Sequence, residues 1–354
     1  MKRIGTVTSA IGFIFIGIWM ILRNVDKALA KQFFNWWPIT IVLFGIEIIF
    51  FYGRKRGNEK IGFNFLIVPV FIAFLIINVF VRLGNDINFL NNGIKIDLKD
   101  FNIDSNDTKK IRCEKSLNAI GNSLNFNTRN GDINVKKSAD GEIKFDLIVY
   151  VDKNKNINNY DLKENNLNEG LKVGINESYV RGVKGDIYVP DGYRVIMNIN
   201  NIKLEGESNL SAVEWDIKGD NGTLTIPGGN SLILNMDNVK FDGKNIKTAK
   251  VRVDNGSVDF KGDLQQCNIQ VGNGKVDIEN KVCKDINVDV NMGVVEMKTS
   301  DSNMNVNLDV SQGKCSLNDD TRVNSGLIKP LGQGTGKLNM KVKSGTIKVS
   351  NQGW

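Results

Sequence analysis

The stretch AKVRVDNGSVDF at residues 249–260 decides the fold of the longer part of this 354-residue chain. Three apolar residues alternate with polar ones, a polar pair and a glycine follow, and the alternation then resumes. The pattern returns as CNIQVGNGKVDI at 267–278 and INVDVNMGVVEM at 286–297. Alternation with a period of two is typical of a β-strand with one buried face, and glycine after a polar residue suits a turn. Each copy therefore predicts a strand, a turn and a second strand.

Further copies make this pattern a repeat. The residues before the turn are spaced by about 17–20, with one longer step of about 32 to Val342, and LNFNTRNGDINV at 124–135 is a detached earlier copy. One unit cannot bury its own apolar face, whereas stacked units bury their faces together. We therefore expect a single-stranded β-helix, or β-solenoid, over residues 191–354, with a β-sandwich as the alternative. The other copies are VIMNINNIKLEG at 195–206, WDIKGDNGTLTI at 215–226, LILNMDNVKFDG at 232–243, VNLDVSQGKCSL at 306–317 and LNMKVKSGTIKV at 338–349.

Residues 85–190 are less regular and predict an irregular β region with an exposed, Asn-rich loop at 152–170. An open solenoid end exposes unpaired strand edges. We expect residues 94–190 to cover one end and the insertion at 320–337 to cover the other, with pairing of two chains as the alternative. The abundant asparagine either forms side-chain ladders between stacked turns or reflects biased composition, and the sequence leaves both open.

The first 84 residues contain long apolar runs, such as IGFIFIGIWMIL and PITIVLFGIEIIFFY. A helix needs about 20 residues to cross a hydrocarbon core of about 30 Å. We therefore predict an α-helical transmembrane segment of about three helices at residues 1–84, followed by the all-β domain. Cleavage of the first run as a signal peptide is the alternative. The expected spans are about 5–22, 37–52 and 61–83.

The formal charge of +7 belongs to this N-terminal part, because residues 1–83 hold ten Lys/Arg against three Asp/Glu and the remaining residues balance. This distribution excludes a nucleic-acid footprint on the repeats. The basic loops orient the helices with the N-terminus inside the cell, by the positive-inside rule. The expected location is the cell membrane, as a multi-pass protein in contact with the lipid bilayer, with the C-terminal domain outside the cytoplasm.

Several N-terminal residues are candidate site residues. Tryptophan and basic side chains favour the membrane interface, which predicts anchors at Trp36, Trp37, Arg54, Lys55 and Arg56. Glu47 lies inside the second apolar run, where a carboxylate is costly. It either has a role within the membrane, in sensing or ion binding, or reaches the interface and contacts another helix.

The remaining candidates for chemistry are few. The chain has no histidine, which excludes Ser-His-Asp and Cys-His nucleophiles and His-ligated zinc. Cys267, Cys283 and Cys315 fall on apolar positions of the repeat, so we expect free, buried thiols, although disulfides stay open. The single glycine of each turn does not match a calcium β-roll. We therefore predict no enzyme activity, no catalytic or metal site and no cofactor.

The first ~55 residues, with IGFIFIGIWMIL and WWPITIVLFGIE, resemble the membrane region of LiaI/LiaF-type envelope-stress proteins of bacteria. The repeats, entered through IYVPDGYRVIMNINNIKLEG, resemble the β-solenoid called the toastrack or "putative adhesin" domain. The resemblance implies a protein that senses or buffers cell-envelope stress, often alongside a two-component sensor kinase. It supplies no catalytic residue.

The leading hypothesis is therefore a membrane-anchored, non-enzymatic envelope-stress sensing, signalling or accessory protein. Its extracytoplasmic solenoid would contact a membrane or envelope protein, and a homo-oligomer is compatible with the open solenoid ends. The alternative is an adhesin-like structural or binding module of the cell surface, anchored but without signalling.

Overall fold

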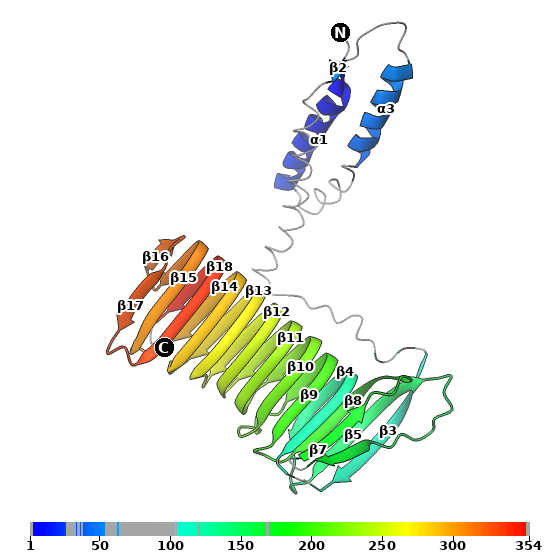
Figure 1. Ribbon diagram of the computed structural model, residues 1–354, viewed down its shortest axis with the longest axis vertical. Coiled ribbons are helices and arrows are strands. Elements are labelled where there is room, and N and C mark those ends of the chain that lie inside the picture. The colour runs from blue at the N-terminus through cyan, green and yellow to red at the C-terminus, as the bar shows by residue number, and fades with distance from the viewer. Residues whose placement is uncertain are drawn as a thin grey trace. The chain divides into compact units, whose positions relative to one another are not determined.

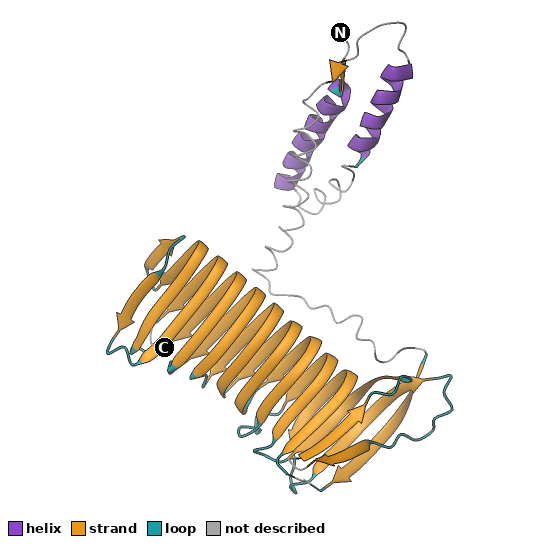
Figure 2. Cartoon of the chain, in the orientation of Figure 1, coloured by secondary structure: helices purple, strands orange, loops and turns teal. Residues whose placement is uncertain are grey.

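The computed structural model describes residues 3–25, 33, 36, 38–53, 62–63, 103, 105, 107–118, 121–167 and 170–351. The chain divides into two compact units, Met1–Asn88 and Phe89–Trp354. Helices belong to the first unit and long strands to the second (Figure 2).

The first unit contains helix α1 (Thr6–Val25), which contacts helix α3 (Ile39–Gly53), and two short parallel strands, β1 (Arg3–Ile4) and β2 (Gly62–Phe63). Each helix is formed by one of the first two apolar runs of the sequence. At about 1.5 Å per residue, the 15 residues of α3 extend about 22 Å, which is shorter than a hydrocarbon core.

Within the described residues, neither α1 nor α3 combines the length and the apolar character that crossing a membrane requires. The prediction of about three transmembrane helices is therefore wrong, and so is the multi-pass membrane location that depended on it. Apart from Gly62 and Phe63, the third expected span at 61–83 lies outside the described residues.

The described strands of the second unit, β3 to β18, all join one 16-stranded sheet. The bounds of its strands are β3 Thr108–Leu117, β4 Ser123–Lys137, β5 Ile143–Asp152, β6 Lys163–Leu167, β7 Gly170–Ile175, β8 Val180–Val189, β9 Arg194–Gly206, β10 Glu214–Ile226, β11 Gly229–Lys244, β12 Ile246–Gly262, β13 Gln266–Asn280, β14 Asp285–Thr299, β15 Met304–Leu317, β16 Asp320–Val323, β17 Leu327–Leu331 and β18 Gly336–Ser350.

The long strands stack in parallel and in register, one coil of the solenoid on the next (Figure 1). In β12, Val251 and Val253 are buried, two polar residues follow, and Val258 and Phe260 are buried next. The alternation thus changes phase at Asp254 and Asn255, where the strand bends. Both halves of each strand consequently turn their apolar side chains towards one core.

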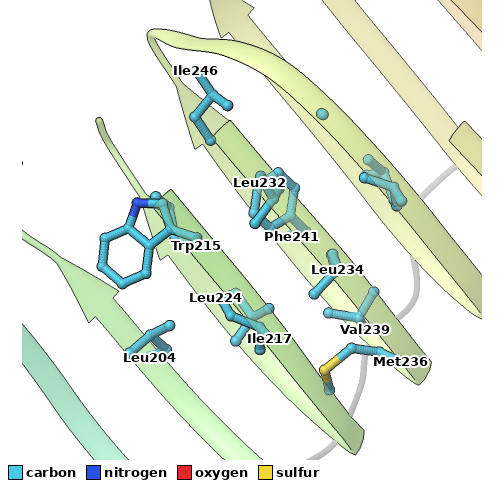
Figure 3. Close-up of a cluster of buried hydrophobic side chains, with 14 of the residues drawn as sticks. Leu204, Trp215, Ile217, Leu224, Leu232, Leu234, Met236, Val239, Phe241 and Ile246 are labelled. Atoms are coloured by element: carbon cyan, nitrogen blue, oxygen red, sulfur yellow. The ribbon is translucent and has the colours of Figure 1, made fainter. Parts of the chain in front are cut away.

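That core is continuous along the whole stack. Leu224, Leu232 and Phe241 lie together in it, from both halves of adjacent coils (Figure 3). Trp215 is 1% exposed, and its indole N–H donates to the carbonyl of Gly228 at 3.0 Å. The period-two pattern of the sequence therefore correctly predicts a stacked solenoid with one buried face per strand.

Two strands interrupt the sequential order of the coils. β18 pairs in parallel with β14 on one side and β15 on the other, so it lies between two strands that are consecutive in the chain (Figure 1). At the opposite end, β4 lies between β9 and the coil formed by β7 and β8. The detached copy at 124–135 is therefore an integral coil of the stack, and the longer step before Val342 accommodates β16 and β17.

Antiparallel strands cover both ends of the stack. At the C-terminal end, β16 pairs with the second half of β15 and β17 with its first half. At the other end, β5 pairs with β8, β3 with β5, and β6 with β7. Both the 94–190 region and the 320–337 insertion thus supply the expected covering strands.

Candidate binding surface

The outward side chains of the solenoid form rows. Because neighbouring parallel strands lie about 4.8 Å apart and in register, equivalent residues of successive coils stack directly on one another. A row of like side chains therefore presents the same chemistry repeatedly along the stack. One such row lies at the bend of the strands, and another lies on the half of each strand that follows the bend.

The bend carries a ladder of asparagine amides. Each Nδ2 donates to the Oδ1 of the preceding coil at 2.8–3.2 Å. The ladder ends at β14, where Met292 faces Asn273. Since these amides satisfy one another's hydrogen-bonding groups, the ladder stabilises the stack. At least these asparagines therefore form a side-chain ladder between stacked turns, which the sequence alone left open. Its members are Asn130, Asn201, Asn221, Asn238, Asn255 and Asn273.

We expect Asn238→Ala, in the middle of the ladder, to lower the free energy of unfolding by about 1–2 kcal/mol. The substitution removes two bonds, leaving the Asn255 amide without its acceptor and the Asn221 carbonyl without its donor. Asn273→Ala is the matched control, because it removes only the bond to Asn255. Urea unfolding of both variants would contradict the ladder if Asn238→Ala cost no more than Asn273→Ala.

A row of carboxylates follows the bend on four successive coils. Lysines on either side partly cover it: Lys261 lies 3.4 Å from Asp259, and Lys275 lies 3.0 Å from both Asp277 and Glu296. A shallow cavity of about 280 Å³ opens over the row between β12 and β14. The carboxylates are Asp242, Asp259, Asp277 and Glu296.

The stacking perturbs the acids. Burial raises the pKa of Asp259; Lys261 opposes the rise, and the like charge of Asp242 adds to it. One Asp259 oxygen is buried without a hydrogen-bond partner. Burial likewise raises the pKa of Asp277, against Lys275, whereas the hydrogen bond from Lys275 lowers the pKa of Glu296. Keeping Asp259 charged therefore lowers the free energy of unfolding of the solenoid.

We expect Asp259→Asn to stabilise the solenoid by about 1 kcal/mol at pH 7 and by nothing below pH ~4. A carboxyl whose pKa is raised by folding contributes stability that is complete below its unfolded pKa. That contribution is lost as the pH rises through the folded pKa, and Asn does not lose it. The charges facing Asp259 are Asp242 on β11, Lys261 on its own strand, and Lys275 and Asp277 on β13.

The measurement is the difference in melting temperature between Asp259→Asn and wild type from pH 3 to pH 8. Asp254→Asn, on the exposed bend of the same strand, controls for the loss of a surface carboxylate. A stabilisation by Asp259→Asn that becomes smaller as the pH rises would contradict a raised pKa of Asp259 in the folded state.

The candidate residues of the N-terminal region have separate positions. Glu47 is buried and caps helix α1, because its carboxylate accepts the N–H groups of Gly5 and Thr8 at 3.0 Å and that of Val7 at 3.3 Å. The N–H groups of a first helical turn have no partner within the helix, and an anion stabilises them. Trp36 is 62% exposed. Trp37, Arg54, Lys55 and Arg56 lie outside the described residues.

The cysteines are free and buried, as the repeat register predicts for Cys267, Cys283 and Cys315; Cys113 is buried as well. Burial raises the pKa of the Cys267 and Cys283 thiols to about 12, so neither supplies a thiolate near neutral pH. In the part of the chain that the structure describes, no three His, Cys, Asp or Glu side chains gather as metal ligands. The carboxylate row escaped sequence reasoning, although aligning the repeats places its four acids in one column.

No protein-family model matches the chain, and no curated protein matches it, so the resemblance to LiaI/LiaF-type proteins finds no support. Among solved structures, the chain is similar to a "putative cell adhesion protein" from Clostridium sporogenes and a "putative adhesin" from Bacteroides fragilis. The first match covers 68% of this chain and 99% of that one, with 13% identity and a TM-score of 0.22. The second covers 68% and 97%, with 13% identity and a TM-score of 0.29. At these TM-scores neither match assigns a fold or a function to the chain.

Proposed function

We propose that the solenoid is a non-enzymatic, adhesin-like binding module that recognises its partner through its outward rows. The in-register parallel stack carries this proposal, because it repeats each outward side chain at the spacing of the strands. A repeating surface is complementary to a partner that is itself repetitive, such as a polymer or an array of identical groups. One continuous core supports the rows.

The outward polar groups also suit binding. Many of them already pair with one another, as in the asparagine ladder and the lysine–carboxylate contacts. Side chains held in this way lose little conformational freedom when a partner arrives, which favours affinity.

The test uses the full chain attached to beads and counts the retained cells of the strain that produces it. We expect several-fold more cells on wild-type beads than on beads carrying Gly345→Ala, a variant designed to unfold the C-terminal coils of the solenoid. Equal retention would overturn the binding proposal.

Envelope-stress signalling with a sensor kinase or another envelope protein stays a prediction of the resemblance. Deleting the solenoid residues in the producing strain separates the two functions. A change in stress-gene expression without a change in attachment would favour signalling, whereas the reverse would favour the binding module.

A further inference from the structure

A second cavity, of about 650 Å³, lies beside the first residues of β9, away from the rows described above. It is formed by the turn before β4, the turn before β9 and the beginnings of β9 and β10. The side chains that face it are mostly polar, and Ile196 adds one apolar surface. The lining residues are Gly121, Asn122, Ser123, Gly192, Arg194, Ile196 and Glu214.

The Arg194 side chain, which lines this cavity, is held in position by a buried carboxylate. Its guanidinium donates to Asp216 at 2.7 Å, and the Asp216 side chain is only 6% exposed. Lys218 lies 3.6 Å from the other oxygen of the same carboxylate. The Arg194 side chain is itself 46% exposed, so its remaining N–H groups can reach a ligand. A buried acid thus holds a partly exposed donor in place.

Glu214 provides an acceptor at the same place. It is the register partner of Arg194 on the adjacent strand, about 4.8 Å away along the stack. Its exposed carboxylate makes no hydrogen bond or ion pair with any residue that the structure describes. The backbone N–H of Arg194 donates to the backbone carbonyl of Asn122 at 2.8 Å, so Asn122 lies next to Arg194 in the lining of the cavity. The cavity therefore places a donor that is held in position, Arg194, next to an acceptor without a partner among the described residues, Glu214.

We propose that this cavity binds a sugar unit of a neutral glycan, an inference that rests on the proposed binding function and names its ligand class. Sugar hydroxyls donate and accept, so neighbouring hydroxyls can accept from Arg194 and donate to Glu214. Ile196 offers an apolar surface to the C–H face of the ring. The carboxylates of Glu214 and Asp216 would repel an anionic ligand, and the guanidinium of Arg194 would repel a cationic one, so a neutral ligand is favoured. A cavity of this volume has the size of small-molecule sites.

The experiment titrates the full chain with four neutral probes: maltotetraose, cellotetraose, mannotetraose and chitotetraose. We expect at least one to bind with a Kd on the order of 1 mM or tighter by calorimetry. Glu214→Gln and Asn122→Ala should each weaken that binding, Glu214→Gln by about tenfold because a charged acceptor is lost. Glu205→Gln, an exposed carboxylate on the second half of β9, is the matched control and should bind as wild type does.

Melting curves identical to wild type confirm that the variants are folded. The proposal is overturned if no tetrasaccharide binds, or if both cavity variants bind as wild type does. It is also overturned if only a tetragalacturonate or free glutamate binds, since these would identify an anion site or a zwitterion site. If the beads retain cells but no tetrasaccharide binds, only the proposed sugar site is refuted. If neither cell retention nor sugar binding is observed, the proposed binding function is refuted as well.

Discussion

Gly345→Ala is expected to lower the free energy of unfolding of the solenoid by at least about 3 kcal/mol, enough to unfold its C-terminal coils. A column of glycines runs through the second half of the stack, directly after the bend. A Cβ placed on Gly345 would lie 1.8 Å from the carbonyl oxygen of Gly293 and 2.8 Å from its carbon. The obstacle is backbone, which cannot rotate away as a side chain can.

The neighbours of Gly345 make relief harder. Gly313, on the far side of β18, would place its own Cβ 1.8 Å from the carbonyl oxygen of Gly345, so the coils are close on both sides. The φ angle of Gly345 is +146°, which side chains rarely adopt. Moving β18 away from β14 would also break the parallel hydrogen bonds of that pair.

Gly174→Ala is the matched control, because Gly174 also lies in a parallel strand, and the nearest atom to its Cβ is Asn176 Nδ2 at 3.7 Å. We expect a change within about 1 kcal/mol for that variant. Urea denaturation followed by circular dichroism measures both. Equal stabilities of the two variants would show that the close approach at the bend is not required.

Removing β18 by ending the chain at Thr335 is expected to abolish folding of the C-terminal coils. β18 lies between β14 and β15, and its apolar side chains are almost fully buried. At about 1.5–3 kcal/mol for each of five buried side chains, the loss amounts to about 7–15 kcal/mol. The side chains lost from the core are Leu338, Met340, Val342, Ile347 and Val349.

The expected result differs from that of a solenoid whose coils follow chain order. Losing the last coil of such a stack leaves the earlier coils folded, because each coil contacts only its neighbours. Here the truncation removes an internal coil, so β15, β16 and β17 should lose their hydrogen-exchange protection together. Slow exchange retained in β15 would contradict this. A chain that lacks only residues 352–354 keeps all of β18 and serves as the control.

Much of the solenoid can be read directly from local sequence. Alternation alone predicts that Val251, Val253 and Val258 lie in the core, and each is 1% exposed. The alignment of Cys267 and Cys283 with apolar residues of other repeats predicts buried thiols, and both side chains are buried. Such predictions succeed because a strand with one buried face leaves a period-two record in the residues themselves.

The N-terminal region shows the limit of this reasoning. The apolar runs do correspond to α1 and α3, but their length and composition did not establish a membrane span. Glu47 could not be assigned as a cap from sequence, because the N–H groups it accepts belong to residues about 40 positions away. The cavity at Arg194 was missed for the same reason, since Gly121, Arg194 and Glu214 meet only in the folded chain.

Local sequence specifies a single coil of the solenoid: two strand halves, a bend with glycine after it, and an apolar face of fixed register. The order in which the coils stack is set by contacts that form only in the folded chain. Every coil carries nearly the same pattern, so any two of them can pair in register, and local preferences do not distinguish β14–β15 from β14–β18–β15. The long connections through β16 and β17, and from β4 to β7, allow β18 and β4 to take internal positions in the stack. Close backbone contacts, such as those of Gly345 with Gly293 and Gly313, then fit β18 between its two neighbours.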